Sequence, residues 1–167
     1  MSALAKEDIT AIAQRGYADP IFFCSFFLEE WFPLPMPAVH RGLVAILTKK
    51  ADFLLNFDEH YTEAGLNWII ENFVWKDDWN DPLSKSHPIF IRGKNSIKLV
   101  LGKYTQIMMP RGASKTTIVN AINIWYILYQ DCKFPVFLSE TGSHASRQLT
   151  NVTTQLTTNG RILTVFG

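Results

Sequence analysis

The stretch Met109-Pro-Arg-Gly-Ala-Ser-Lys-Thr-Thr117 places a lysine and two hydroxyl side chains directly after a small turn. In the phosphate-binding pattern G-x-x-x-x-G-K-[ST], the lysine reaches the β and γ phosphates of a nucleotide and the next hydroxyl binds Mg²⁺. Here these roles fall to Lys115 and Thr116. Met109 and Ser114 stand where the pattern has glycines, and the glycine of the turn is Gly112.

Two apolar segments flank this loop and would position it. Residues 97–109 are rich in β-branched and long apolar side chains around Gly102-Lys103, which predicts a hairpin ending in a buried strand. After the loop, apolar residues at helical spacing predict a helix with one apolar face; they are Ile118, Ile122, Trp125 and Tyr129. The free N–H groups at the start of such a helix bind anions. The alternative is a plain polar turn with Lys115 in solvent.

All eight residues that follow Met109 are candidate nucleotide-binding residues, and two of them are candidate catalytic residues. The eight are Pro110, Arg111, Gly112, Ala113, Ser114, Lys115, Thr116 and Thr117. Lys115 and Arg111 would neutralise charge on the transferred phosphate, and Thr116 would be the protein ligand of Mg²⁺. A surface salt bridge is the alternative role of Arg111.

The order of predicted elements from residue 97 onward is strand, loop, helix, strand and helix. This alternation predicts a right-handed βαβ unit and a mostly parallel sheet. The second strand would span residues 135–139, and the buried face of the next helix would carry Ala145, Leu149, Val152 and Leu156. Glu140 would then face the ligand at the carboxyl end of that strand. Capping of the helix by Thr141 or Ser143 is the alternative use of this segment.

Four patches of the chain, in order, resemble the large terminase subunits of tailed bacteriophages. Residues 110–117 resemble the family's Walker A segment, in which serine can replace the second glycine and an arginine stands early in the loop. Residues 134–149 resemble its second strand and the following helix. The N-terminal segment and a downstream stretch are matched by residues 19–28, 31–32, 39–43, 159–163 and 166–167.

This resemblance implies an α/β fold with a P-loop NTPase-type parallel sheet, present as an incomplete first βαβ portion and preceded by an N-terminal helical region. It implies ATP and Mg²⁺ as cofactors, and ATP hydrolysis that drives double-stranded DNA into a procapsid in the host cytoplasm. The implied partners are double-stranded DNA, the small terminase subunit, the portal protein and the C-terminal remainder of the large terminase. It also places His40 near the adenine, where the alternative is a partly buried histidine hydrogen-bonded within a helical layer.

Two parts of a complete large terminase are missing from these 167 residues. The family carries Walker B acids at the end of an apolar strand well beyond the loop, and a nuclease domain with clustered carboxylates. We therefore expect a split or truncated large subunit that, alone, binds nucleotide poorly and hydrolyses it little or not at all. The alternatives are a helicase-like P-loop ATPase fragment, and a non-catalytic interaction module or remnant that needs a partner chain.

The chain divides into an N-terminal helical region (1–60), a helix with an irregular connector (61–96) and the first part of the ATPase domain (97–167). Helices are predicted over residues 4–15, from Asp19-Pro20 through an aromatic stripe to Phe32, and over 38–53 and 61–75. Gly16 would end the first of them.

Composition limits the class of protein. A hydrophobic fraction of 47%, a charged fraction of 19% and a net charge of +1 are typical of a soluble globular protein and do not support a basic DNA-coating protein. Cys24 and Cys132 favour a reducing compartment, and no apolar run is long enough to span a membrane. No zinc spacing occurs around His60 or His87, and the acidic run at residues 77–81 is typical of a solvated loop.

Overall fold

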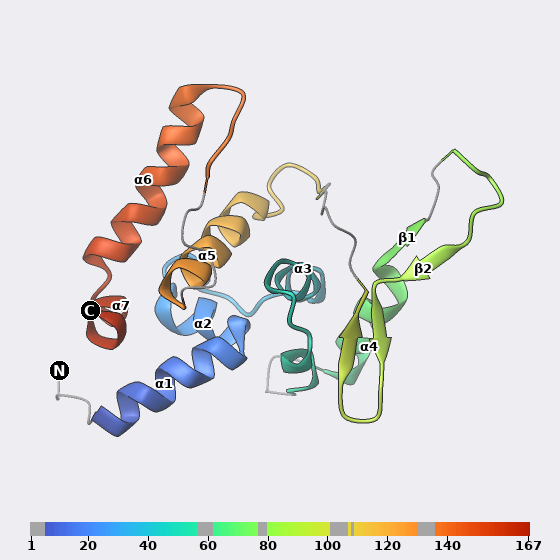
Figure 1. The fold of residues 1–167 in the computed structure, drawn as a ribbon, viewed down its shortest axis with the longest axis horizontal. Helices are drawn as coiled ribbons and strands as arrows, with labels where there is room; N and C mark the ends of the chain where they lie inside the picture. Colours follow the sequence, from blue (N-terminus) through green and yellow to red (C-terminus); the bar gives the residue numbers. More distant parts are fainter. Residues whose placement is uncertain (1–5, 57–61, 77–79, 101–106, 108, 130–135) are drawn as a thin grey trace. The chain divides into compact units, whose positions relative to one another are not determined.

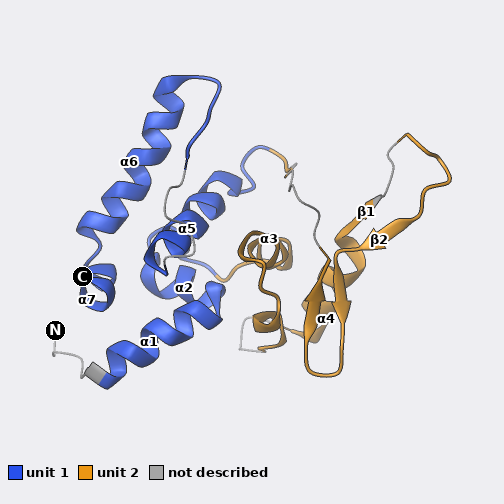
Figure 2. Cartoon of the chain, in the orientation of Figure 1, with its two compact units in different colours: residues 1–34, 111–167 blue, residues 35–110 orange. Residues whose placement is uncertain are grey.

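The computed structural model describes residues 6–56, 62–76, 80–100, 107, 109–129 and 136–167. In chain order (Figure 1), the elements are α1 (Lys6–Ala18), α2 (Pro20–Phe27), α3 (Ala38–Thr48), the 3₁₀ helix η1 (Asp52–Leu55), α4 (Glu63–Asn72), β1 (Val74–Lys76), β2 (Ser86–Pro88), β3 (Phe90–Arg92), β4 (Ile97–Leu99), α5 (Lys115–Leu128), α6 (Gly142–Thr158) and α7 (Gly160–Phe166). They form two compact units, one from residues 1–34 and 111–167 and the other from residues 35–110 (Figure 2).

Between α1 and α2, Asp19 caps the second helix as predicted, but Gly16 does not end the first one. Asp19 Oδ1 accepts hydrogen bonds from the N–H groups of Ile21 and Phe22, and Pro20 occupies the first turn of α2. Gly16 was expected to end α1, but the helix continues to Ala18. The residue is buried against aromatic side chains, so its lack of a side chain serves close packing and not a helix end.

The core of the first unit lies around α5 and the aromatic residues of α1, α2 and α7. Trp125 is fully buried, stacks on Tyr17 with ring centroids 5.5 Å apart, and donates from Nε1 to Gly16 O at 2.9 Å. The predicted apolar face of α5 is confirmed, since Ile118 and Ile122 are buried with it. The buried face of α5 therefore fixes the position of its N-terminus within this unit.

The helix α6 packs against α5 and α7, and fewer of its apolar residues are buried than its sequence predicts. Of the four residues expected to form its buried face, only Val152 is buried, and Leu149 is 52% exposed. Asn159 caps α7 through Oδ1 and also donates from Nδ2 to Phe27 O at 2.7 Å. A hydrogen bond from the end of α6 to Phe27 O therefore supplements the limited apolar packing of this helix.

The second unit packs α3, η1 and α4 with two small hairpins. Its buried side chains include Leu43, Val44, Leu54, Leu66, Ile69 and Phe90. The helix predicted over residues 38–53 divides into α3 and η1, and the one predicted over 61–75 is shorter, because residues from Val74 onward enter a strand. The strand β1 pairs antiparallel with β2, and β3 pairs antiparallel with β4.

The predicted α/β fold with a P-loop NTPase-type parallel sheet is wrong. Residues 97–99 form β4, which pairs with β3 through a tight turn in which the Gly93 N–H donates to Ser96 O at 2.8 Å. A local turn closes this pair at little entropic cost, so residues 97–99 pair with the strand that precedes them. Residues 136–139 form no strand, with Val136 and Leu138 exposed. Both sheets among the described residues are two-stranded and antiparallel. The turn predicted at Gly102-Lys103 lies outside the described residues.

Within the part of the chain that the structure describes, no helix combines the length and apolar character that a membrane span requires.

Candidate functional site: the loop before α5 and the pocket beside it

The loop that enters α5 contains two residues with left-handed backbone conformations. Gly112 has a φ of 82°, and Ser114 has φ 51° and ψ 17°. An added Cβ at Gly112 would meet nothing within 4 Å, so its conformation, and not its surroundings, favours glycine there. The chain thus turns sharply and enters the helix at Lys115, as the motif predicts.

The first turn of α5 lacks a side-chain cap. Asp19, Thr62, Thr141 and Asn159 cap α2, α4, α6 and α7 with side-chain oxygens, whereas α3 and α5 start without a side-chain cap. The first N–H groups of a helix have no acceptor within the helix, and they carry the positive end of its dipole. This turn can therefore donate to an anion.

The predicted site residues lie in both units. In the first unit, Arg111, Gly112, Ser114 and Thr116 are exposed, while Ala113, Lys115 and Thr117 are half-buried. In the second unit, Pro110 is exposed and His40 is half-buried on α3. Residues 111–117 are thus contiguous on one surface loop and helix turn of the first unit.

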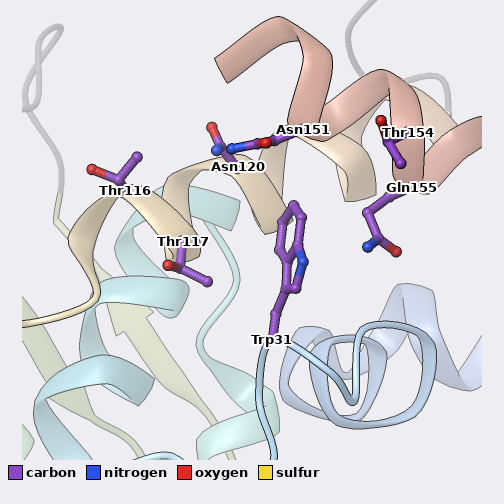
Figure 3. A pocket seen from close by; sticks show the side chains of 7 residues that line it. All are labelled: Trp31, Thr116, Thr117, Asn120, Asn151, Thr154 and Gln155. Atoms are coloured by element: carbon purple, nitrogen blue, oxygen red, sulfur yellow. The ribbon is translucent and has the colours of Figure 1, made fainter. Parts of the chain in front are cut away.

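A pocket of about 470 Å³ lies beside this turn. Its lining comes from α5, α6 and the segment after α2: Trp31, Thr116, Thr117, Asn120, Asn151, Thr154 and Gln155. Figure 3 shows the Trp31 indole standing between the α5 side chains and those of α6. The pocket shares Thr116 and Thr117 with the candidate phosphate loop, so the two features adjoin.

Sequence reasoning missed this pocket. The helix predicted through the aromatic stripe to Phe32 ends at Phe27. Phe23 and Phe27 are buried, but Trp31 is only half-buried in the turn that follows. Residues 151, 154 and 155 share one face of α6, but polar residues occur around most of this helix, so the sequence does not distinguish that face.

Other polar groups that drew attention in the sequence have structural roles. Thr141 caps α6 by accepting a hydrogen bond from the His144 N–H at 3.3 Å, and Glu140 is exposed. Burial raises the pKa of the Cys24 thiol, which therefore stays protonated and is a poor nucleophile. Over the described ranges, no three histidine, cysteine or acidic side chains gather in a way that would hold a metal ion.

Comparisons of the chain with protein-family models, with curated proteins and with solved structures found no match.

Proposed function

We propose that this chain is the nucleotide-binding N-terminal portion of a DNA-packaging ATPase, and that residues 111–117 bind the phosphates of ATP with Mg²⁺. The observation that carries the proposal is the entry to α5. A flexible turn with two left-handed residues ends at an uncapped helix N-terminus whose first side chain is Lys115. The loop sequence that resembles a terminase Walker A segment supports the DNA-packaging role.

The chemistry assigned to each residue follows from charge and position. The N–H groups of the first turn and the Lys115 ammonium would bind phosphate oxygens, and Arg111 would add a second positive charge from the exposed loop. The Thr116 hydroxyl is exposed in the first turn and fits one Mg²⁺ coordination position. Mg²⁺ at such sites keeps several waters and binds substrate phosphates, and Thr116 would add one protein ligand. Mg²⁺ would reduce the negative charge of the triphosphate.

An NMR titration of the full chain with ATP and MgCl₂ tests the proposal. This method measures millimolar dissociation constants, which suits the weak binding expected of the chain alone. We expect the amide resonances of residues 111–117 to shift, and the Lys115→Ala variant to bind at least about tenfold more weakly, because a charge-assisted hydrogen bond contributes about 1.5–3 kcal/mol.

Lys94→Ala is the matched control, since Lys94 is exposed in the β3–β4 turn and is outside the proposed site. It should bind ATP as the wild type does. Equal affinity of the Lys115→Ala variant and the wild type, or shifts confined to residues outside 111–117, would reject the phosphate-binding role.

A further inference from the structure

The pocket beside α5 has a polarity that phosphate binding does not explain. Six of its seven lining side chains are uncharged polar groups, the seventh is the Trp31 indole, and none of the seven is charged. Its volume of about 470 Å³ lies within the range of roughly 300–1,000 Å³ found for small-molecule sites. A neutral, flat and polar group matches this lining better than an ion does.

The orientation of one amide in the pocket is determined by backbone groups outside it. Asn159 Oδ1 accepts from the N–H groups of Arg161 and Ile162, so its Nδ2 is the atom that donates to Phe27 O at 2.7 Å. The same Nδ2 donates to Gln155 Oε1 at 2.8 Å. Gln155 must therefore turn its oxygen toward Asn159, and its Nε2 remains as a donor. No described residue accepts a hydrogen bond from that Nε2.

A second amide of the pocket lining is that of Asn120 on α5. Asn120 is 4% exposed and donates from Nδ2 to Gln148 Oε1. Its Oδ1 receives no hydrogen bond from the residues that the structure describes. A buried polar atom without a partner costs about 1–3 kcal/mol, so a pocket that admits water or a ligand is the favourable surrounding for it. The pocket therefore offers an amide donor and an aromatic face.

We propose that this pocket holds the base of a purine nucleoside triphosphate whose phosphates lie at residues 111–117, an inference that rests on the proposed function. Thr116 and Thr117 border both the pocket and the loop, so a ligand can occupy the two together. A bicyclic purine matches the bicyclic indole of Trp31 in stacking, and its edge carries ring-nitrogen acceptors for Gln155 Nε2.

Titration of the full chain with three probes separates the base from the phosphates. The probes are Mg-ATP, inorganic tripolyphosphate with Mg²⁺, and adenosine, each followed by NMR. Trp31→Leu should weaken ATP binding by about 5- to 150-fold, the range that corresponds to the energy of one stacked base, and leave tripolyphosphate binding unchanged. Gln155→Met, which keeps the side-chain length, should weaken ATP binding by about 2- to 10-fold. Lys115→Ala should weaken ATP and tripolyphosphate binding but leave adenosine binding as it is.

Trp68→Leu is the matched control, because Trp68 is an exposed tryptophan of the other unit. Wild-type affinity of the Trp31→Leu variant for ATP and adenosine would overturn the base pocket, even where Lys115→Ala confirms the phosphate site. Adenosine binding that depends on Trp31, without tripolyphosphate binding, would support the pocket and reject the proposed function. Circular dichroism checks that Trp31→Leu is folded, and Gln155→Met decides the question where it is not.

Discussion

Replacement of Gly16 by alanine sets helix propensity against close packing. Gly16 lies inside α1, where alanine is favoured over glycine by about 0.5–1 kcal/mol. The Cβ of an alanine there would lie 2.5 Å from Tyr129 Oη and 3.3 Å from Phe27 Cε2. Tyr129 Oη donates to Ala13 O at 2.8 Å, so the hydroxyl cannot move away without losing this bond.

The packing contribution is the larger of the two. Overpacking of a buried site costs about 1–3 kcal/mol, and the lost hydrogen bond costs about 0.5–1.5 kcal/mol more. After the helix propensity is subtracted, we expect Gly16→Ala to lower the free energy of unfolding by about 0.5–4 kcal/mol.

Urea unfolding followed by circular dichroism measures this change, and a double-mutant cycle with Tyr129→Phe locates its cause. The phenylalanine removes the atom that the new methyl group would strike, so Gly16→Ala in that background should change stability by less than about 1 kcal/mol. A stabilising effect of Gly16→Ala in the wild type, or an equal loss in both backgrounds, would refute the packing argument.

Two further predictions concern the same unit. Burial raises the pKa of Tyr129 above its ordinary value of 10.0, so the neutral phenol is favoured in the folded state. The contribution of this neutral phenol to the free energy of unfolding is complete below pH 10 and declines as the pH rises above it. Between pH 8 and pH 11, the free energy of unfolding measured in urea should therefore fall less for Tyr129→Phe than for the wild type. Asn159→Ala removes the cap of α7 and the bond to Phe27 O, and should lower the free energy of unfolding by about 1–3 kcal/mol. Thr164→Ala, at an exposed position of α7, should cost less than about 0.5 kcal/mol in the same assay, and a cost equal to that of Asn159→Ala would count against the capping role.

Local patterns predicted the helices and their starts well. Asp19-Pro20 starts α2, Lys115 opens α5, and Ile118, Ile122 and Trp125 form its buried face. Each of these features depends on residues within one or two turns, so the sequence contains the whole cause. The same patterns missed the β1–β2 and β3–β4 hairpins, whose strands are three residues long and too short to show a period.

Part of the candidate site was predicted from the sequence, and part became visible only in the structure. The phosphate-binding role of Lys115 and Arg111 came from their order in the loop and stays a prediction, as does the assignment of His40. The pocket depends on Trp31, Asn120 and Gln155, which are far apart in the sequence and meet only because α5 and α6 pack together. No spacing rule along the chain relates these three positions.

The sequence by itself determined where the helices form and where a lysine meets a helix N-terminus, because capping, helical periodicity and turn chemistry act between near neighbours. Only the tertiary structure decided how the strands pair and which polar side chains share a cavity. Strand pairing depends on which segments of the chain meet, and the cavity forms where Trp31 meets residues of α5 and α6.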